Sequence, residues 1–425
     1  MKYIKKFERH SDYEAFMGGV EYVTPNVSYC VNEDEVHYNP IESYDPILKF
    51  TAEQANSTIQ LNRIGTETTF ANSVFQYSIN NGEWHDVVFS STTVYTIYVE
   101  DGSEIVLTES ELEEQYNGDI DYALEQLLGM YYDIATNATG DTITLENVGD
   151  SVKFKGTNTT LGVNSVNYHQ FVMTGKIKAT GDITSLFNEV GGDMVMPSYG
   201  CGYLFKGCSS LTTAPELPST TLGSYCYAFM FQGCTSLTTA TSILPAITLA
   251  GYCYQNMFRE CTSLTEAPEL PATTLANGCY MSMFQGCTSL TTAPSILPAI
   301  TLANNCYQFM FQGCASLTAA PELPATTLAT NCYYYMFSLC TSLTAAPELP
   351  ATTLANKCYT FMFQGCSNLN YIKALFTTTP SNTYTQNWVL GVKSTGTFVK
   401  NSSATWNVTG VNGIPTRWTV QTASV

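Results

Sequence analysis

The sequence predicts a multidomain protein with a mainly β N-terminal part that carries a short helical insertion, then an α/β solenoid of seven repeats, then a β-rich C-terminal cap. The main observation is a phrase that recurs seven times between Cys201 and Cys366, with its second cysteine advancing by 26 or 27 residues each time. Such a period is typical of a solenoid, in which each repeat buries its apolar side against its neighbours. Before this array apolar and polar residues alternate, and after it the period ends and tryptophans appear.

The composition excludes several classes of partner. The chain has 425 residues, a formal net charge of −19, and only 12% charged residues. Residues 1–200 carry a net charge of −20, residues 201–370 carry −3, and the last 55 residues carry +4. Phosphate binding needs a basic face, so we expect no nucleic-acid partner. No window approaches 18 consecutive apolar residues and no apolar signal segment follows the basic start, so we expect no membrane insertion and synthesis in a cytoplasm.

Residues 1–48 are predicted to be an N-terminal attachment segment. Two runs of strand-like composition, Asn26–Cys30 and Glu35–Tyr38, lie on either side of the polar Asn32–Asp34, which predicts a hairpin. We interpret the lone histidine of this hairpin as structural rather than catalytic. The residues expected to contact a larger assembly are Tyr29, Val36, His37 and Tyr38.

Residues 49–199 are predicted to form a β-sandwich-like domain. Short segments with period-two alternation, such as Thr58–Leu61 and Val74–Ile79, indicate strands, and Asn80–Gly82 indicates a turn. Further strands are expected at 48–50, 86–89, 93–98, 142–145, 152–154 and 171–173.

A helical insertion is predicted at residues 108–135, within this domain. Thr108 and Glu111 fit the spacing of a capping box at a helix start. One helical stripe of apolar residues would follow, made of Ile120, Leu124, Leu127, Leu128 and Tyr131.

Residues 200–369 are predicted to form the solenoid. In each repeat, Cys-Tyr-x-x-Met-Phe contains two pairs of residues four positions apart, which predicts roughly one and a half turns of helix. The glycine before the second cysteine suits a helix end. The Thr-x-Ala after the repeat's leucine suits a short parallel strand, and Pro-x-Leu-Pro, which cannot join a central ladder, suits an extended return segment.

Two residue types recur in register and are expected to stack as a structural core ladder. The second cysteines are Cys208, Cys234, Cys261, Cys287, Cys314, Cys340 and Cys366, and the leucines are Leu211, Leu237, Leu264, Leu290, Leu317, Leu343 and Leu369. Zinc sites use closer cysteine pairs than these, usually with histidine, and the array has no histidine, so we expect no metal and no cofactor. In a reducing cytoplasm we expect the cysteines to be free, buried thiols.

Residues 370–425 are predicted to be a β-rich capping domain over the last coil. They contain Trp388, Trp406 and Trp418 together with glycine-rich turns. Solenoids need such a cap because their terminal coils would otherwise expose the apolar core.

The repeat phrase Met-Phe-Gln-Gly-Cys-Thr-Ser-Leu resembles the BspA-like leucine-rich repeats of bacterial surface proteins over residues 201–369. The chain ends, including Pro25–Cys30, Glu35–Pro40 and Gly396–Lys400, are similar to segments of virion and prophage proteins of gut Bacteroidales phages, including crAss-like phages. This second resemblance implies a phage appendage, such as a head fibre, capsid decoration or tail-fibre component, whose leader attaches to the particle.

The expected function is therefore that of a virion structural protein, made in the host cytoplasm, that presents the solenoid for host-surface or glycan adhesion. The alternative is a bacterial BspA-like cell-surface adhesin. An enzyme is not expected, because the array holds no catalytic constellation, and its recurring acids, such as Glu216 and Glu269, suit a solvated row.

The expected partners are other virion proteins through the N-terminal region, a host glycan or protein, and further copies of the chain as a homo-oligomer. The tyrosines after the first cysteine of six repeats offer flat contact area and form the expected ligand face, unless they are buried against each other. These residues are Tyr227, Tyr254, Tyr280, Tyr307, Tyr333 and Tyr359.

Overall fold

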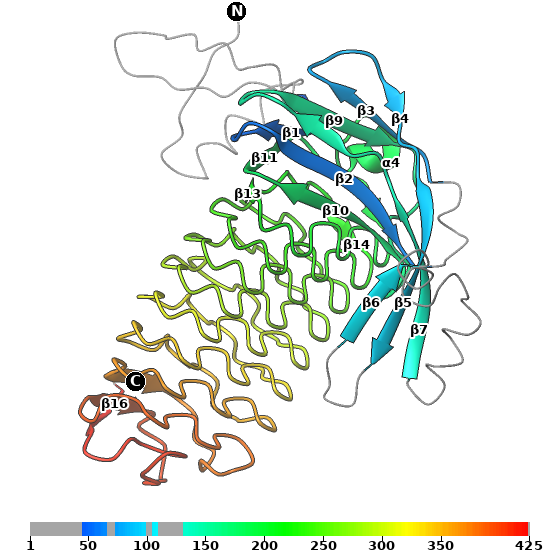
Figure 1. The fold of residues 1–425 in the computed structure, drawn as a ribbon. Coiled ribbons are helices and arrows are strands. Elements are labelled where there is room, and N and C mark those ends of the chain that lie inside the picture. Colours follow the sequence, from blue (N-terminus) through cyan, green and yellow to red (C-terminus); the bar gives the residue numbers. More distant parts are fainter. Residues whose placement is uncertain (1–44, 66–72, 99–103, 109–130, 424–425) are drawn as a thin grey trace, which may run out of the picture. The chain divides into compact units, whose positions relative to one another are not determined.

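The computed structural model describes residues 45–65, 73–98, 104–108 and 131–423 (Figure 1). The four residues proposed for attachment, Tyr29, Val36, His37 and Tyr38, lie outside the described residues, as does the predicted hairpin that contains them. Ile47–Val425 form one compact unit.

The first part of this unit is a pair of six-stranded sheets (Figure 1). The first has the order β13-β11-β1-β9-β3-β4, with bounds Leu211–Thr213, Ile177–Thr180, Leu48–Ala52, Ser151–Gly156, Phe75–Ile79 and His85–Asp86. The second has the order β10-β2-β7-β5-β6, with bounds Tyr168–Thr174, Ser57–Ile64, Tyr131–Thr139, Ser90–Tyr98 and Glu104–Thr108, and β8 (Ile143–Leu145) also pairs with β2.

Aromatic rings from both sheets meet in a shared core. The ring of Phe50 in β1 lies 5.0 Å from that of Phe171 in β10 and 5.8 Å from that of Phe154 in β9, each in an edge-to-face arrangement that aromatic pairs prefer. The alternating burial of β1 and of the first half of β2 reflects this core, because successive side chains of a strand point to opposite faces. The described residues before the solenoid are thus mainly β, as the sequence predicted.

The structure corrects part of the predicted helical insertion. Thr108, the expected helix cap, is the last residue of β6, and Tyr131, expected in the helical stripe, is the first residue of β7. Both strands pair with β5, so their backbone groups are held in a sheet. The remaining stripe residues, Ile120, Leu124, Leu127 and Leu128, lie outside the described part of the chain.

The second part is a β-solenoid of about nine turns that contains the seven sequence repeats. The expected helices are absent from these repeats, where Cys-Tyr-x-x-Met-Phe forms a run of consecutive turns instead. Alternate amides along this run bond to the next coil, as in Tyr227 N to Cys253 O at 3.0 Å. The amides between them bond three residues back in the same coil, as in Met230 N to Tyr227 O at 3.3 Å.

The reason is a left-handed residue at every fourth position of the run. In one repeat Tyr225, Phe229 and Gly233 have φ of 57°, 60° and 75°. A helix requires right-handed φ throughout, so this pattern breaks it and turns the amides toward neighbouring coils. Among the described residues, the α-helix α4 (Ser185–Asn188) is the one helical element, so the α/β class predicted for the solenoid is wrong.

The Pro-x-Leu-Pro segments also pair, contrary to the expected unpaired return. The glutamate after the first proline supplies the amide that proline lacks, as in Glu269 N to Ser242 O at 2.9 Å. Parallel bridges join Ile243 to Glu269 and Ile296 to Glu322, and Leu244 N donates to Glu269 O at 3.1 Å. The solenoid therefore has parallel pairing along this face as well.

Both ends of the solenoid continue into neighbouring structure. At the N-terminal end, β11 of the first sheet pairs in parallel with β13, and the ring of Phe171 stacks on that of Phe205 at 5.2 Å. At the C-terminal end, β15 (Tyr371–Ala374), β16 (Thr397–Lys400) and β17 (Thr419–Thr422) form a parallel sheet. The Trp388 carbonyl accepts from the Phe363 amide at 2.9 Å, which adds a coil beyond the last sequence repeat.

Candidate binding surface

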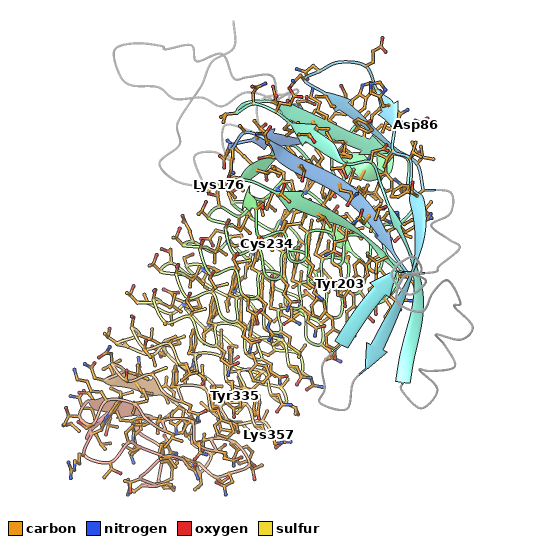
Figure 2. The ribbon with its side chains drawn as sticks, viewed as in Figure 1. Asp86, Lys176, Tyr203, Cys234, Tyr335 and Lys357 are labelled. Carbon is orange, nitrogen blue, oxygen red and sulfur yellow. The ribbon has the colours of Figure 1, made fainter. Side chains whose placement is uncertain are left out.

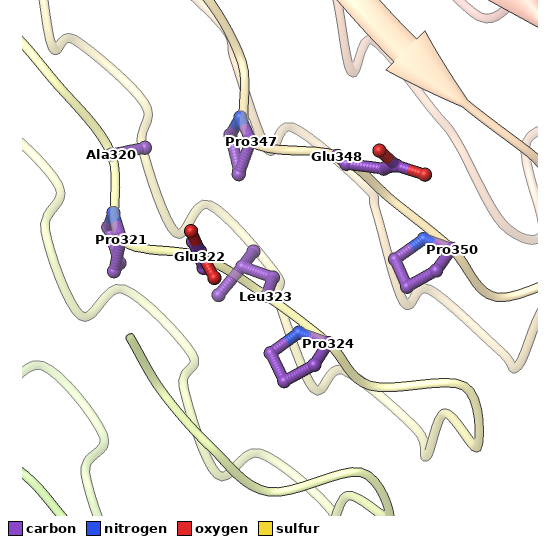
Figure 3. A pocket seen from close by; sticks show the side chains of 8 residues that line it. All are labelled: Ala320, Pro321, Glu322, Leu323, Pro324, Pro347, Glu348 and Pro350. Carbon is purple, nitrogen blue, oxygen red and sulfur yellow. The ribbon is translucent and has the colours of Figure 1, made fainter. Parts of the chain in front are cut away.

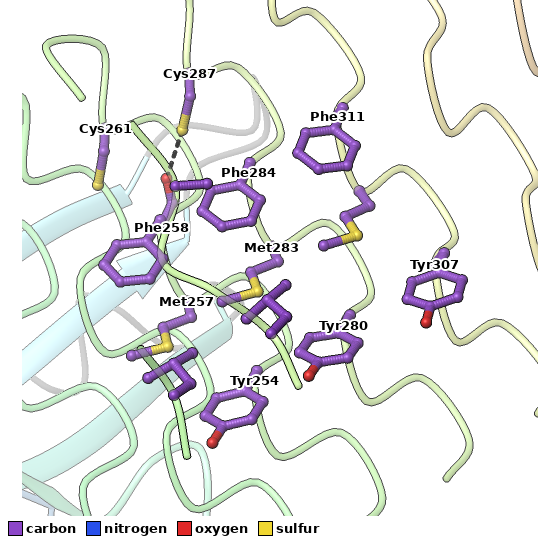
Figure 4. Packing of buried hydrophobic residues seen from close by; sticks show 14 of the residues in the cluster. Tyr254, Met257, Phe258, Cys261, Tyr280, Met283, Phe284, Cys287, Tyr307 and Phe311 are labelled. Carbon is purple, nitrogen blue, oxygen red and sulfur yellow. Dashed lines mark hydrogen bonds between the residues drawn. The ribbon is translucent and has the colours of Figure 1, made fainter. Parts of the chain in front are cut away.

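The cysteine and leucine columns lie in the solenoid core. All seven second cysteines and all seven leucines are buried. The thiols from Cys234 to Cys366 each donate to the carbonyl of the repeat's phenylalanine in the preceding coil, as in Cys287 Sγ to Phe258 O at 3.0 Å (Figure 4). Cys208 donates to the carbonyl of Phe171 in β10. The phenylalanine rings stack in a parallel column beside them, 5.6 Å apart between Phe258 and Phe284.

The first repeat shows why its two cysteines are seven residues apart rather than eight. Cys201 N donates to Cys226 O, the bond that Tyr227 N makes to Cys253 O one coil later. Cys201 therefore occupies the place of the ladder tyrosine, and the second cysteines keep their register.

Burial disfavours ionisation of these thiols. Desolvation raises the pKa of Cys287 to about 12, and it raises the pKa of Cys279 to about 12 as well. The fourteen cysteines of the array are free and buried. A thiolate is the nucleophile and metal ligand, so these groups are core residues in the folded chain.

The tyrosines expected to form a ligand face are buried in the core instead. Tyr227, Tyr254, Tyr280, Tyr307, Tyr333 and Tyr359 are each at most 2% exposed, so they cannot offer contact area to a ligand. Their rings stack coil upon coil, 5.6 Å apart between Tyr254 and Tyr280 (Figure 4).

Partly exposed aromatic rows that the sequence analysis did not identify lie at other positions of the turn run. Tyr199, Tyr225 and Tyr252 stack at 4.9 Å with nearly parallel rings. Further along, Tyr335 stacks on Phe361 at 4.3 Å, and it lies on the same side of the stack as Tyr203 (Figure 2). Stacked rings cover one another's faces and leave mainly their edges to solvent, so a ligand that stacks on a ring face finds little room there.

One hollow lies on the face formed by the Pro-x-Leu-Pro segments. It has a volume of about 520 Å³ and is lined by Ala320–Pro324, Pro347, Glu348 and Pro350. Each glutamate lies between two proline rings, and the arrangement repeats in the adjacent coil (Figure 3). We call the column of such residues along the stack the Pro-Glu groove.

A second hollow lies three coils earlier and overlaps these repeat positions in part. It has a volume of about 290 Å³ and is lined by Thr238–Ser242, Thr265–Ala267 and Glu269. A third, of about 360 Å³, lies where the first coils meet the sandwich and includes Glu53, Lys176 and Thr212. The second hollow shares Glu269 with the Pro-Glu groove, whereas the third contains no residue of the Pro-x-Leu-Pro segments.

The charge of the Pro-Glu groove is negative. Its carboxylates are Glu216, Glu269, Glu322 and Glu348, all exposed. At its C-terminal end Lys373 Nζ lies 2.8 Å from Glu348 Oε2, and this hydrogen bond raises the pKa of Lys373. At its N-terminal end the Thr241 hydroxyl donates to Glu216 Oε2 at 2.9 Å, so the carboxylates between these ends, Glu269 and Glu322, are the acceptors the groove offers to a ligand.

Two buried ionisable groups have structural roles. Burial lowers the pKa of His169 to about 4, and its ring lies 5.0 Å from that of Phe75 while Nδ1 is 3.1 Å from Leu161 O. Burial raises the pKa of Asp182, whose carboxylate accepts bonds from the amide and hydroxyl of Thr184 at 2.8 Å and from the amide of Gly192. In the described ranges no three His, Cys, Asp or Glu side chains gather closely enough to hold a metal ion.

The fold and this surface define a parallel β-solenoid capped by a β-sandwich. No family model, curated protein or solved structure matches the chain. No helix in the described residues has the length and apolar character to cross a membrane.

Proposed function

We propose that the chain is a structural protein of a phage particle, a head fibre, capsid decoration or tail-fibre component, that displays the solenoid for adhesion to a host surface. The observation that carries this proposal is the unbroken core from Phe171 in the sandwich to Trp388 beyond the last repeat. A body of this kind acts through a long repetitive surface, because each coil adds the same exposed residues.

Two further observations support the proposal. The similarity of the chain ends to virion proteins of gut Bacteroidales phages suits an N-terminal segment, residues 1–48, that attaches to other virion proteins. The fourteen free thiols suit a chain that folds in the reducing cytoplasm of a host cell.

The alternative is a BspA-like adhesin of a bacterial cell surface, which the repeat phrase Met-Phe-Gln-Gly-Cys-Thr-Ser-Leu favours. Immunogold labelling with antibodies against the full chain separates the two. Gold on intact phage particles, in a lysate of infected cells, is expected under the proposal. Gold on uninfected bacterial envelopes, with particles unlabelled, would favour the adhesin.

A further inference from the structure

Two coils of the Pro-Glu groove carry isoleucine where the neighbouring coils carry glutamate. In the coil of Glu269, the exposed side chains of the return segment include Glu269 and Thr273. In the preceding coil the same places are taken by Ile243 and Ile247, which are 43% and 61% exposed. The parallel bridge from Ile243 to Glu269 and the bond from Thr273 N to Ile247 O fix this register.

The alternation repeats two coils later. Ile296 pairs with Glu322, and Ile300 is 62% exposed beside Thr326, whose amide donates to the Ile300 carbonyl. These isoleucines belong to the copies that carry one extra residue. From Ile243 to Glu322 the surface therefore repeats every two coils, or roughly 9–10 Å at the usual spacing of parallel strands. The alternation ends there, because the next coil carries Glu348 in place of an isoleucine.

We infer that the Pro-Glu groove, over the coils from Ile243 to Glu322, binds a linear, non-anionic polysaccharide whose disaccharide repeat spans two coils. This inference rests on the proposed adhesive function and names its ligand class and site. Isoleucine coils would contact the apolar face of alternate sugar rings, and glutamate coils would accept hydrogen bonds from sugar hydroxyls.

The negative charge of the groove and its two-coil period favour a neutral glycan over an anionic glycan, a second copy of the chain or an extended peptide. The exposed carboxylates of the groove repel an anionic glycan, and they repel a second copy of this face by the same like-charge contact. An extended peptide repeats every two residues, roughly 6.7 Å, which matches neither one coil nor two. Two coils span roughly 9–10 Å, which is close to the length of one disaccharide in an extended β-linked glycan.

The groove's composition predicts weak binding by each sugar unit. Its lining has no aromatic ring, so affinity must come from several units bound at once. Linking units in one chain makes each later contact intramolecular, so affinity should rise with oligosaccharide length.

The test measures binding of the full-length chain to immobilised cello- and chito-oligosaccharides of two, four and six sugars, with sulfated heparin oligosaccharides and oligolysine as comparison probes. Affinity for at least one of the two neutral series is expected to rise severalfold with each added disaccharide. The double variant Ile247→Thr with Ile300→Thr, which gives these coils the threonine of their neighbours, is expected to bind the hexasaccharide about tenfold more weakly.

The matched control is Val148→Thr with Val166→Thr, which changes two exposed valines of the sandwich and should leave binding unchanged. Binding that does not depend on length, equal binding of the sulfated probe, binding of oligolysine alone, or an unaffected double variant would each overturn the inference. A lack of binding to both neutral series also overturns it. The immunogold experiment tests the location of the chain on phage particles and does not depend on glycan binding. A negative binding result is therefore distinguishable from failure of the proposed function.

Discussion

Left-handed backbone conformations recur at every fourth residue in the turn run, and they strain any residue that has a Cβ. In one repeat they fall on Asn305, Phe309 and Gly313, with φ of 57°, 58° and 75°. Glycine adopts this conformation without strain, whereas a branched or bulky side chain adds roughly 1–2 kcal/mol at such a residue. Two repeats carry Glu260 and Leu339 at the glycine position, with φ of 62° and 63°.

Replacing Leu339 by glycine is therefore expected to stabilise the protein. Leu339 is 52% exposed, so little packing is lost, and the strain of left-handed φ is relieved. We expect Leu339→Gly to raise the free energy of unfolding by about 1 kcal/mol, measured by urea denaturation. Leu339→Ala keeps the Cβ and the strain, so it serves as the control and should bring no gain. A glycine variant no more stable than the alanine variant would contradict this account.

The buried thiols make stability depend on alkaline pH. Burial raises the pKa of Cys287 and Cys366 to about 12, whereas thiols of the unfolded chain ionise near pH 8.5. Above that pH the unfolded state loses protons that the folded state keeps. Each such thiol then lowers the free energy of unfolding by about 1.4 kcal/mol per pH unit until the folded pKa is reached.

With fourteen such thiols, we expect urea midpoints to be constant near neutral pH and to fall steeply above about pH 9. Labelling with a thiol reagent should be slow in the folded chain even at pH 10 and fast in urea. Midpoints that stay unchanged between pH 7 and pH 10.5 would refute burial of the thiols.

At the scale of the single coil, the sequence predicted the period and the stacked columns but not the backbone between them. A cysteine and a methionine four residues apart would lie on one face of a helix. In the structure both are buried, but the backbone between them forms consecutive turns that bond to the adjacent coil. The distinguishing signal was the recurrence of glycine or asparagine at the left-handed positions, as at Asn256, Gly278, Gly286, Asn305 and Asn331. The Pro-Glu groove could not be predicted, because its hollows depend on how proline segments of adjacent coils bend.

Coils joined by identical contacts should be removable one at a time. Deleting the 26 residues Thr262–Cys287 connects Cys261 to Thr288 and keeps every column in register. We expect this variant to unfold cooperatively, with a moderately lower midpoint because one interface is lost. Deleting only Thr262–Ala276 is the control, since it puts the columns out of register and should prevent folding. Equal behaviour of the two deletions would argue against the stacked-coil description.

At the scale of the whole described unit, the sandwich is part of the solenoid's core. Phe171 of β10 stacks on Phe205, and its carbonyl accepts the Cys208 thiol at 3.0 Å, as a preceding coil would. The sequence predicted the sandwich strands from their alternation. It could not predict this continuity, because no repeat phrase precedes Cys201.

Removing the sandwich should therefore destabilise the solenoid. We expect a chain of residues 191–425 to aggregate or to unfold at a clearly lower temperature than the full chain, by calorimetry. In the full chain, Phe171→Ala should cost about 3–5 kcal/mol. Val172→Ala, on the exposed face of the same strand, is the control and should cost little. A truncated chain as stable as the full chain would show that the solenoid does not depend on this cap.

The near identity of successive coils also bears on how genes for such a chain diverge. Recombination between two copies of the repeat adds or deletes a coil without creating a new junction, so the product keeps its ends and its interior contacts. Each event changes the length of the solenoid by about 4.8 Å. The loss or gain of a single coil also changes the order of the coils that carry isoleucine and those that carry glutamate. Related strains should therefore differ more often in the number of coils than in the buried residues that stabilise each coil.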